Sequence, residues 1–144
     1  MKRLLVLLLC ILLVSCKAKR EDYYRLSFDG MDIAVGYDGT EVLGDPYDID
    51  SYETFTDDKD NVRLKSLVVY LYDVYSDVWI DDYKLTRGIK DTCKDLKGDF
   101  IDKNGHACFI GKEVNGRENY IILYGDILSD DLDRIDRIEI IYDH

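Results

Sequence analysis

The sequence predicts an α+β domain made mainly of antiparallel β-sheet with one or two short helices. Two dipeptides, Asp29-Gly30 and Asn115-Gly116, separate stretches in which apolar and polar residues alternate. This arrangement is typical of β-hairpins with type I′ turns. A third stretch, residues 86–98, has the polar start and the glycine end of a short helix.

The first hairpin is expected over residues 24–37, because apolar positions alternate on both sides of Asp29-Gly30. Residues 45–61 are expected to form a polar, acidic connection that contains the single proline, Pro46. The strongest strand candidate is residues 67–72. Both of its faces are apolar, which predicts a strand in the middle of a sheet that is covered on both sides.

The second half of the chain predicts a short strand over residues 78–80, then the helix, then three strands in an antiparallel meander. Asp91 or Thr92 is expected to cap the helix and Gly98 to end it. The strands are expected over these three ranges: 107–114, 119–124 and 137–142.

Two similar stretches are compatible with a tandem duplication of a helix-plus-meander unit, with repeats at about 23–80 and 81–144. Residues 68–74 can be aligned with residues 121–127 at an offset of 53. Repeated supersecondary units produce such self-similarity. Glycines and apolar strands also match by chance, and this alternative stays open.

Residues 33–46 and 87–96 resemble the repeats of two kinds of bacterial protein, in which a glycine is followed by a short helix and a Leu-Gly motif. These are the tandem fold of the β-lactamase inhibitory protein and the small lipoprotein of the outer-membrane barrel-assembly machine. The chain departs from them because Leu43 is only seven positions after Gly36, so its first helix is cut to about one turn. The resemblance implies a non-enzymatic domain that contacts other proteins, and it transfers no functional residues.

The first sixteen residues are typical of a secretory signal. Lys2 and Arg3 precede an apolar run over residues 4–14, which is too short to span a bilayer. Leu13-Val14-Ser15-Cys16 resembles the lipobox of bacterial lipoproteins, which implies that Cys16 is acylated. On this interpretation residues 1–15 are a signal peptide, residues 16–22 a lipidated tether and residues 23–144 one domain. The alternatives are an ordinary signal peptide with an incidental cysteine, or a buried core helix.

The leader predicts a lipid-anchored, extracytoplasmic protein of the bacterial cell membrane or outer membrane, with the bilayer as its partner through Cys16. Two acyl chains hold a protein firmly, whereas one chain does not. Three basic residues follow the anchor, Lys17, Lys19 and Arg20, and they are expected to lie near anionic headgroups or in an unstructured linker.

The net charge excludes nucleic acid as an expected partner. Without Lys2 and Arg3, 17 of the 19 basic residues remain against 30 acidic ones, which gives a formal charge of -13. Binding to phosphate backbones depends on clustered Lys and Arg. Basic protein partners remain compatible with this charge.

Cys93 and Cys108 form an even pair in a chain predicted to be exported, and a disulfide between them is expected. Two free buried thiols are the alternative. His106 could join them as a third zinc ligand or act as a base. A structural zinc site needs four ligands, and a nucleophile needs an oriented base, so neither is expected.

The sequence predicts no enzyme and no cofactor. It contains neither the phosphate-binding motif G-x-x-x-x-G-K-[ST] nor the nucleophile motif G-x-S-x-G. Weak candidates for a calcium site are Asp57, Asp58 and Asp60, whose alternative is a solvated acidic loop.

The twelve tyrosines are expected to cover the sheet, and the alternative is an exposed aromatic patch that also includes the one tryptophan, because aromatic residues are favoured at interfaces. Its candidates are Tyr23, Tyr24, Tyr47, Tyr52, Tyr75 and Trp79. The expected function is therefore protein binding or envelope assembly. The alternative is binding of a small cationic ligand or calcium by acidic loops.

Overall fold

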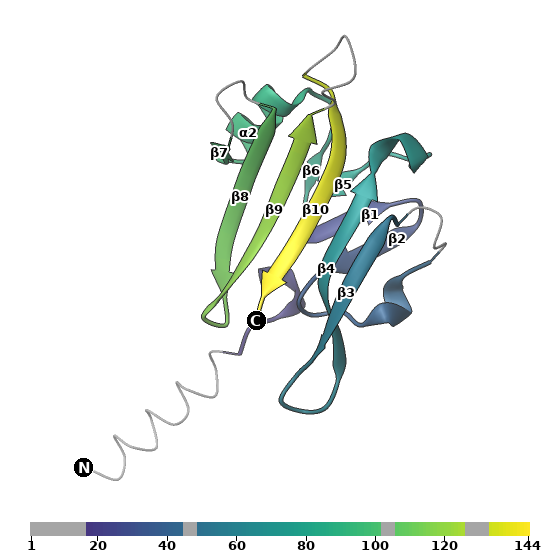
Figure 1. Cartoon of the computed structure of the whole chain (residues 1–144), viewed down its shortest axis with the longest axis vertical. Helices are drawn as coiled ribbons and strands as arrows, with labels where there is room; N and C mark the ends of the chain where they lie inside the picture. Colours follow the sequence, from purple (N-terminus) through teal and green to yellow (C-terminus); the bar gives the residue numbers. More distant parts are fainter. Residues whose placement is uncertain (1–16, 45–48, 102–105, 126–132) are drawn as a thin grey trace, which may run out of the picture.

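The computed structural model describes residues 17–44, 49–101, 106–125 and 133–144. These residues form two antiparallel sheets and one α-helix, which confirms the expected mainly antiparallel α+β class (Figure 1). The leader with Cys16, and also Tyr47, lie outside the described residues, so what the sequence predicts for them stays a prediction. Among the described helices, none has the length and apolar character needed to cross a membrane.

The smaller sheet has four strands in the order β2-β1-β5-β6. Their bounds are β1 Arg25–Phe28, β2 Met31–Ala34, β5 Trp79–Ile80 and β6 Tyr83–Lys84. The turn between β1 and β2 has φ of 47° at Asp29 and 77° at Gly30. Positive φ at both positions is what a type I′ turn requires, so the first predicted hairpin is confirmed.

The larger sheet has six strands in the order β3-β4-β10-β9-β8-β7. Their bounds are β3 Ser51–Thr56, β4 Val62–Tyr70, β7 Asp99–Phe100, β8 Ala107–Val114, β9 Arg117–Gly125 and β10 Ile135–Asp143. The predicted meander is thus confirmed, with φ of 53° and 72° at Asn115 and Gly116 in the turn between β8 and β9. Strand β3 lies where a connection was expected, and that expectation was wrong. As an edge strand with mostly exposed side chains, β3 lacks an apolar face that would mark it in the sequence.

The prediction that the central apolar strand is covered on both sides was also wrong. Strand β4 does lie inside the sheet, between β3 and β10. Leu67 and Val69 are buried, but Val68 and Tyr70 point to the opposite face and are only half-buried. The strand ends at Tyr70, and Leu71–Asp73 form the 3-10 helix η4.

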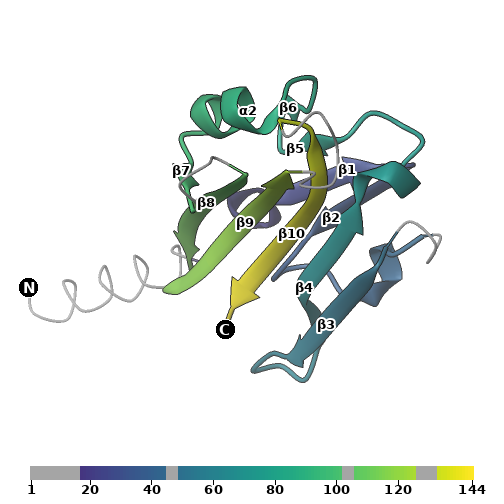
Figure 2. The same cartoon turned by 45° about the horizontal axis from the view of Figure 1, so that its top comes forward.

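The core lies between the two sheets, and the smaller sheet covers one face of the larger one (Figure 2). Leu26 and Ile33 from the smaller sheet belong to the same buried cluster as Ile121 and Ile138 from the larger one. Asn119 of β9 is fully buried and joins the layers, because its Oδ1 accepts the Tyr24 N–H at 2.7 Å. The side chains of the larger sheet that do not point into this core lie on its opposite face.

Helix α2, Ile89–Asp95, packs on the core side of β8 and is linked to it by the disulfide between Cys93 and Cys108. The predicted disulfide is confirmed. The predicted caps Asp91 and Thr92 were wrong, because both lie inside the helix. Instead, the Ile89 and Lys90 amides donate to Asp133, a residue more than 40 positions away. The helix ends as predicted before Gly98, whose amide donates to the Cys93 carbonyl at 2.8 Å.

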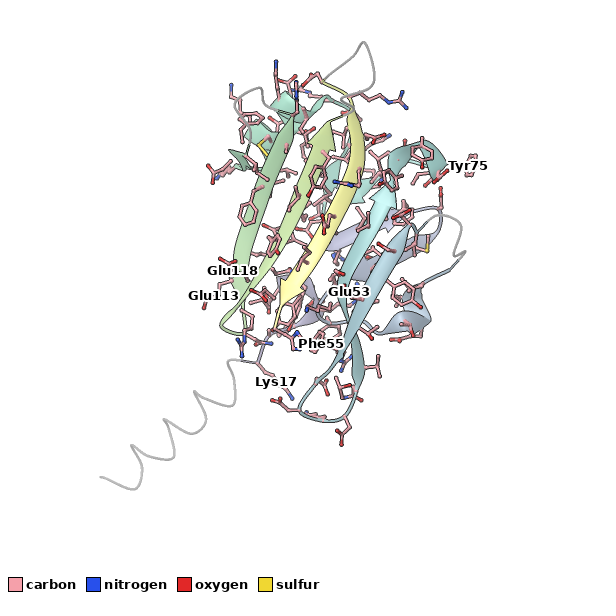
Figure 3. All side chains as sticks on the ribbon, viewed as in Figure 1. Lys17, Glu53, Phe55, Tyr75, Glu113 and Glu118 are labelled. Atoms are coloured by element: carbon pink, nitrogen blue, oxygen red, sulfur yellow. A yellow bond between two sulfur atoms is a disulfide. The ribbon has the colours of Figure 1, made fainter. Side chains whose placement is uncertain are left out.

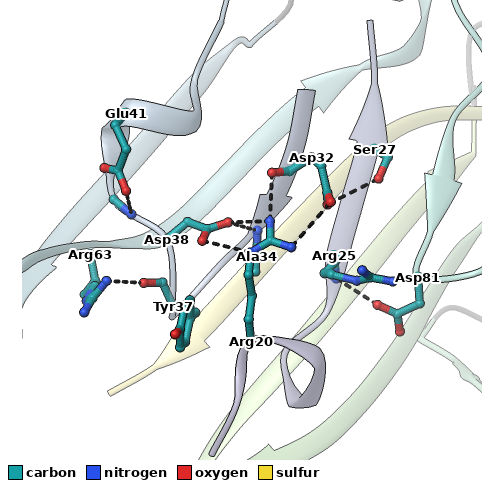
Figure 4. Close-up of polar contacts among 11 residues, drawn as sticks. Arg20, Arg25, Ser27, Asp32, Ala34, Tyr37, Asp38, Glu41, Arg63 and Asp81 are labelled. Carbon is teal, nitrogen blue, oxygen red and sulfur yellow. Dashed lines mark hydrogen bonds and ion pairs between the residues drawn. The ribbon is translucent and has the colours of Figure 1, made fainter. Parts of the chain in front are cut away.

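The segment assigned to the tether is docked on the domain from Arg20 onward (Figure 4). Arg20–Asp22 form the 3-10 helix η1. The Arg20 guanidinium donates to both carboxylate oxygens of the buried Asp38, at 2.8 and 3.1 Å, and to the Asp32 carbonyl at 2.9 Å. The hydrogen bond to Asp38 is the main cause that raises the pKa of Arg20. This ion pair holds the start of the described chain against the sheets.

The predicted tandem duplication stays a prediction. In each half of the chain a hairpin of the smaller sheet is followed by a short helix, η2 (Thr40–Val42) or α2, and then by strands of the larger sheet. However, β1 and β5 are antiparallel, whereas β4 and β9 are both antiparallel to β10 and so parallel to each other. The alignment of residues 68–74 with residues 121–127 makes β4 the counterpart of β9, and the two-fold rotation that relates β1 to β5 does not relate that pair.

Candidate functional site

The predicted aromatic patch does not form as expected. Tyr23 and Tyr24 are only 4% and 9% exposed, so their assignment to a surface was wrong. The ring of Tyr23 contacts those of Tyr37 and Tyr142, each at 5.6 Å between centroids. Burial raises the pKa of Tyr23 and of Tyr24 to about 12. Residues distant in the sequence cover both side chains, and no local pattern reveals this.

Three of the remaining candidates are exposed but separate. Tyr52 lies on the edge strand β3, Tyr75 follows η4 and is 93% exposed, and Trp79 lies on β5. Within the described chain, no ring contact joins any two of them. They are three isolated exposed aromatic side chains rather than one surface.

The weak calcium candidates organise a turn instead. Asp57 Oδ1 accepts the amides of Lys59 and Asn61, each at 2.9 Å, and Oδ2 accepts Arg63 Nε at 3.1 Å. The hydrogen bond from the Asn61 amide is the main cause that lowers the pKa of Asp57 to about 2. Asp58 and Asp60 are exposed at the same turn. Nowhere in the described ranges do three His, Cys, Asp or Glu side chains gather in a way that could hold a metal ion.

The disulfide also decides the chemistry of the cysteines. Both sulfur atoms are bonded to each other, so neither is a thiolate that could act as a nucleophile or bind zinc. The alternative roles of Cys93 and Cys108 beside His106 therefore do not apply to this structure.

The strongest candidate site is the outward face of the six-stranded sheet, which we call the open face. No helix or strand among the described residues lies over it (Figures 1 and 2). The strand registers place the following half-buried side chains on it: Val68, Tyr70, Phe109, Tyr120, Ile122, Tyr124, Arg137, Glu139 and Ile141.

Arg137 lies at the centre of one row of the open face. It is directly opposite Tyr70 on β4 and Tyr124 on β9. Its guanidinium carbon lies 3.8 Å from the Tyr124 ring centroid and 5.8 Å from that of Tyr70. Arg137 Nε is buried and has no hydrogen-bond acceptor among the described residues. The two rings hold the cation in place by stacking, which is a favourable use of a planar guanidinium.

The next rows are apolar and aromatic. Ile122 lies between Phe109 and Glu139, and the ring centroids of Phe109 and Tyr120 are 5.2 Å apart. The Tyr124 hydroxyl donates to Glu139 Oε2 at 3.1 Å. Burial, followed by the charge of Glu139, raises the pKa of Tyr124. These contacts produce a preorganised surface in which large side chains are held by their neighbours.

The end of the open face near the β8–β9 turn is acidic. Glu113, Glu118 and Asp143 are directly opposite one another on three adjacent strands, and Glu53 lies on β3 (Figure 3). Like charges in such cross-strand positions are destabilising. Burial and then the charges of Asp143, Glu139 and Glu118 raise the pKa of Tyr120. The face thus combines half-buried aromatic rings with negative charge.

Reasoning from the sequence missed the open face. Its signal was present, because β9 and β10 carry large residues at both sets of alternate positions. The side chains at one set of alternate positions are buried and those at the other set lie on the outer face. The sequence does not indicate which of the two faces a second layer covers.

No protein-family model, no curated protein and no solved structure matches this chain. The candidate function therefore depends on the open face and on the leader sequence.

Proposed function

We propose that this chain is a lipid-anchored, extracytoplasmic bacterial protein that binds another protein through its open face and catalyses no reaction. The observation that carries the proposal is the row of Tyr70, Arg137 and Tyr124, beside Phe109 and Tyr120, on a sheet face that no described element covers. Tyrosine and arginine are the residues that contribute most at protein interfaces. A role in assembly of the cell envelope agrees with the resemblance to envelope lipoproteins.

The partner surface is expected to be basic. The open face carries Glu53, Glu113, Glu118 and Asp143 near its aromatic rows, and the whole chain has a net charge of -11. Complementary charge speeds association and selects between partners. Lysine or arginine side chains of the partner could pair with these carboxylates and stack on Tyr120.

A photocrosslinking amino acid at Tyr120 tests the proposal in membranes that contain the full chain. We expect a crosslinked protein with the probe at Tyr120, and none with the same probe at the exposed Tyr75. The crosslink should weaken in the Glu118→Lys background and at high salt, because both reduce attraction to a basic partner. Equal crosslinking at Tyr75, or a crosslink unaffected by Glu118→Lys, would contradict binding through the open face.

The anchor has its own test, which is the distribution of the Cys16→Ala variant between membrane and soluble fractions. Acylation predicts that the wild-type chain sediments with membranes and that the variant does not. An unchanged membrane pellet would remove the lipid anchor from the proposal while leaving the open face untouched.

The alternative function, calcium or small-cation binding by the acidic loop, is not proposed. Both oxygens of Asp57, the central residue of that loop, accept hydrogen bonds from the turn and from Arg63.

A further inference from the structure

An open pocket of about 730 Å³ lies at the end of the domain where the described chain begins. We call it the tether-end pocket. Lys17, the β3–β4 turn, Asn115 of the β8–β9 turn and the end of β10 surround it. Figures 1 and 3 show these parts at the same end of the molecule, with Lys17 and Phe55 labelled in Figure 3.

The lining of the pocket is positively charged, in contrast to the chain as a whole. The chain has 19 basic and 30 acidic residues. The pocket is lined by four lysine or arginine side chains and only two carboxylates. These are Lys17, Lys59, Arg63 and Arg117, with Asp57 and Asp58. The charge is therefore concentrated here with the sign that attracts an anion.

Three of these cations form no ion pair within 4.0 Å of a carboxylate of the described residues. Arg63 is already bound to Asp57 at 3.1 Å and to the Tyr37 carbonyl at 2.7 Å. Within the described part of the chain, no ion pair involves Lys17, Lys59 or Arg117.

Lys17, which precedes η1, and Lys59, in the β3–β4 turn, both line the pocket. The close approach of the Lys59 side chain, and then its charge, lower the pKa of Lys17, while the charge of Asp57 acts in the opposite direction. Two ammonium groups that line one pocket repel each other, and an anion bound between them would offset this repulsion.

Aromatic side chains form another wall of the pocket. The rings of Phe55 and His144 are stacked at 4.2 Å between centroids, and Tyr142 lies 5.7 Å from Phe55. Tyr37 also lines the pocket and is exposed. Aromatic rings beside lysine and arginine are characteristic of surfaces that lie at the level of lipid headgroups.

We propose that the tether-end pocket binds the phosphate-bearing headgroup of an anionic lipid. The proposal rests on the lipid anchor of the proposed function, since Lys17 directly follows Cys16. One residue spans at most ~3.6 Å, so an acylated Cys16 would bring Lys17 to the bilayer surface. The docking of Arg20 on Asp38 keeps the segment after Lys17 in place, so the pocket would face the membrane and the open face would remain free for a protein.

Calorimetric titration of the full chain with short-chain lipids tests this inference. The probes are dihexanoyl phosphatidylglycerol, dihexanoyl phosphatidylcholine and inorganic phosphate. We expect phosphatidylglycerol to bind at least about tenfold more tightly than either of the other two, and Lys59→Gln to weaken it about tenfold. The control Lys90→Gln removes the same charge from an exposed position on α2 and should change nothing.

Each other outcome overturns the inference. If phosphatidylcholine binds as tightly as phosphatidylglycerol, the pocket does not distinguish headgroups by their charge. If inorganic phosphate binds as tightly, the pocket is a site for a free anion. The pocket is not the site if titration with phosphatidylglycerol releases or absorbs no heat. The same holds if Lys59→Gln has the wild-type affinity for phosphatidylglycerol and the wild-type melting temperature. Membrane fractionation of Cys16→Ala reports on the anchor alone, so failure of the pocket and failure of the anchor are distinguishable.

Discussion

The guanidinium carbon of Arg137 lies 3.8 Å from the ring centroid of Tyr124, its direct neighbour across two strands of the open face. Tyr70 faces the same guanidinium from the strand on the other side. A cation held between two rings contributes to the fold and also displays a rigid aromatic surface to a partner.

Replacement of Arg137 by alanine is expected to lower the free energy of unfolding by about 1–2 kcal/mol, because the stacking on Tyr124 and Tyr70 is lost. Urea unfolding measures the change. Arg134→Ala removes the same side chain from an exposed position three residues earlier and should have little effect. Equal losses for the two variants would mean that the stacking does not contribute to stability.

Glu118→Lys is expected to stabilise the domain while weakening partner binding. Glu118 lies between Glu113 and Asp143, so a lysine there would replace two repulsions by two attractions. The melting temperature should rise by about 1–4 °C. Glu21→Lys makes the same change of charge at an exposed position in η1 and serves as the control. A lower melting temperature in Glu118→Lys would contradict the cross-strand repulsion.

The disulfide is expected to contribute about 3 kcal/mol to the free energy of unfolding, because Cys93 and Cys108 are 15 residues apart and the bridge restricts the unfolded chain. The double variant Cys93→Ala and Cys108→Ala should melt at a lower temperature than the oxidised protein. Reduction of the wild-type chain, verified by mass, should move its melting temperature in the same direction. A double variant as stable as the oxidised protein would refute this contribution.

Asp57 is expected to make stability fall in acid. Its pKa is about 2 in the folded protein, mainly because it accepts the Asn61 amide, and its ordinary value is 3.8. The ionised carboxylate therefore stabilises the fold above about pH 4, and this contribution is lost as the pH falls toward 2. Between pH 4 and pH 2, the melting temperature should fall less steeply with decreasing pH in Asp57→Asn than in wild type. The exposed Asp58→Asn is the matched control, and identical slopes for wild type and Asp57→Asn would be the contrary result.

Asn119→Leu is expected to cost about 1–3 kcal/mol, because the buried Tyr24 amide would lose its acceptor. The same change removes the weaker bonds from Asn119 Nδ2 to the Val35 and Ile141 carbonyls. Hydrogen exchange of the Tyr24 amide should become faster relative to that of Leu123, in the centre of the sheet. Parallel changes at both amides would indicate global destabilisation instead of the loss of one contact.

Gly36 shows how the aromatic cluster around Tyr23 depends on contacts that no local pattern reveals. Gly36 has a φ of 99°, and a Cβ atom there would lie 2.7 Å from the Tyr142 ring and 2.9 Å from that of Tyr23. Tyr23 was a candidate for an exposed patch because aromatic residues are favoured at interfaces. Packing against a strand more than 100 residues later buries it instead.

The open face illustrates the opposite error. Residues 67–72 are apolar on both sides, which predicted cover on both faces. In the structure Val68 and Tyr70 are displayed beside Ile122 and Tyr124. Apolar character alone does not distinguish a buried face from a binding surface.

The elements that depend on neighbouring residues could be predicted from the sequence. Both type I′ turns, the closing meander and the end of α2 follow from local backbone preferences, and the disulfide follows from an even pair of cysteines. Long-range packing determines which aromatic side chains are buried, that Asp133 caps α2, and that Lys17 and Lys59 line one pocket. Burial and charge proximity depend on which distant segments pack together. The pattern of alternating residues indicates a strand, but it does not indicate which face of that strand another layer covers.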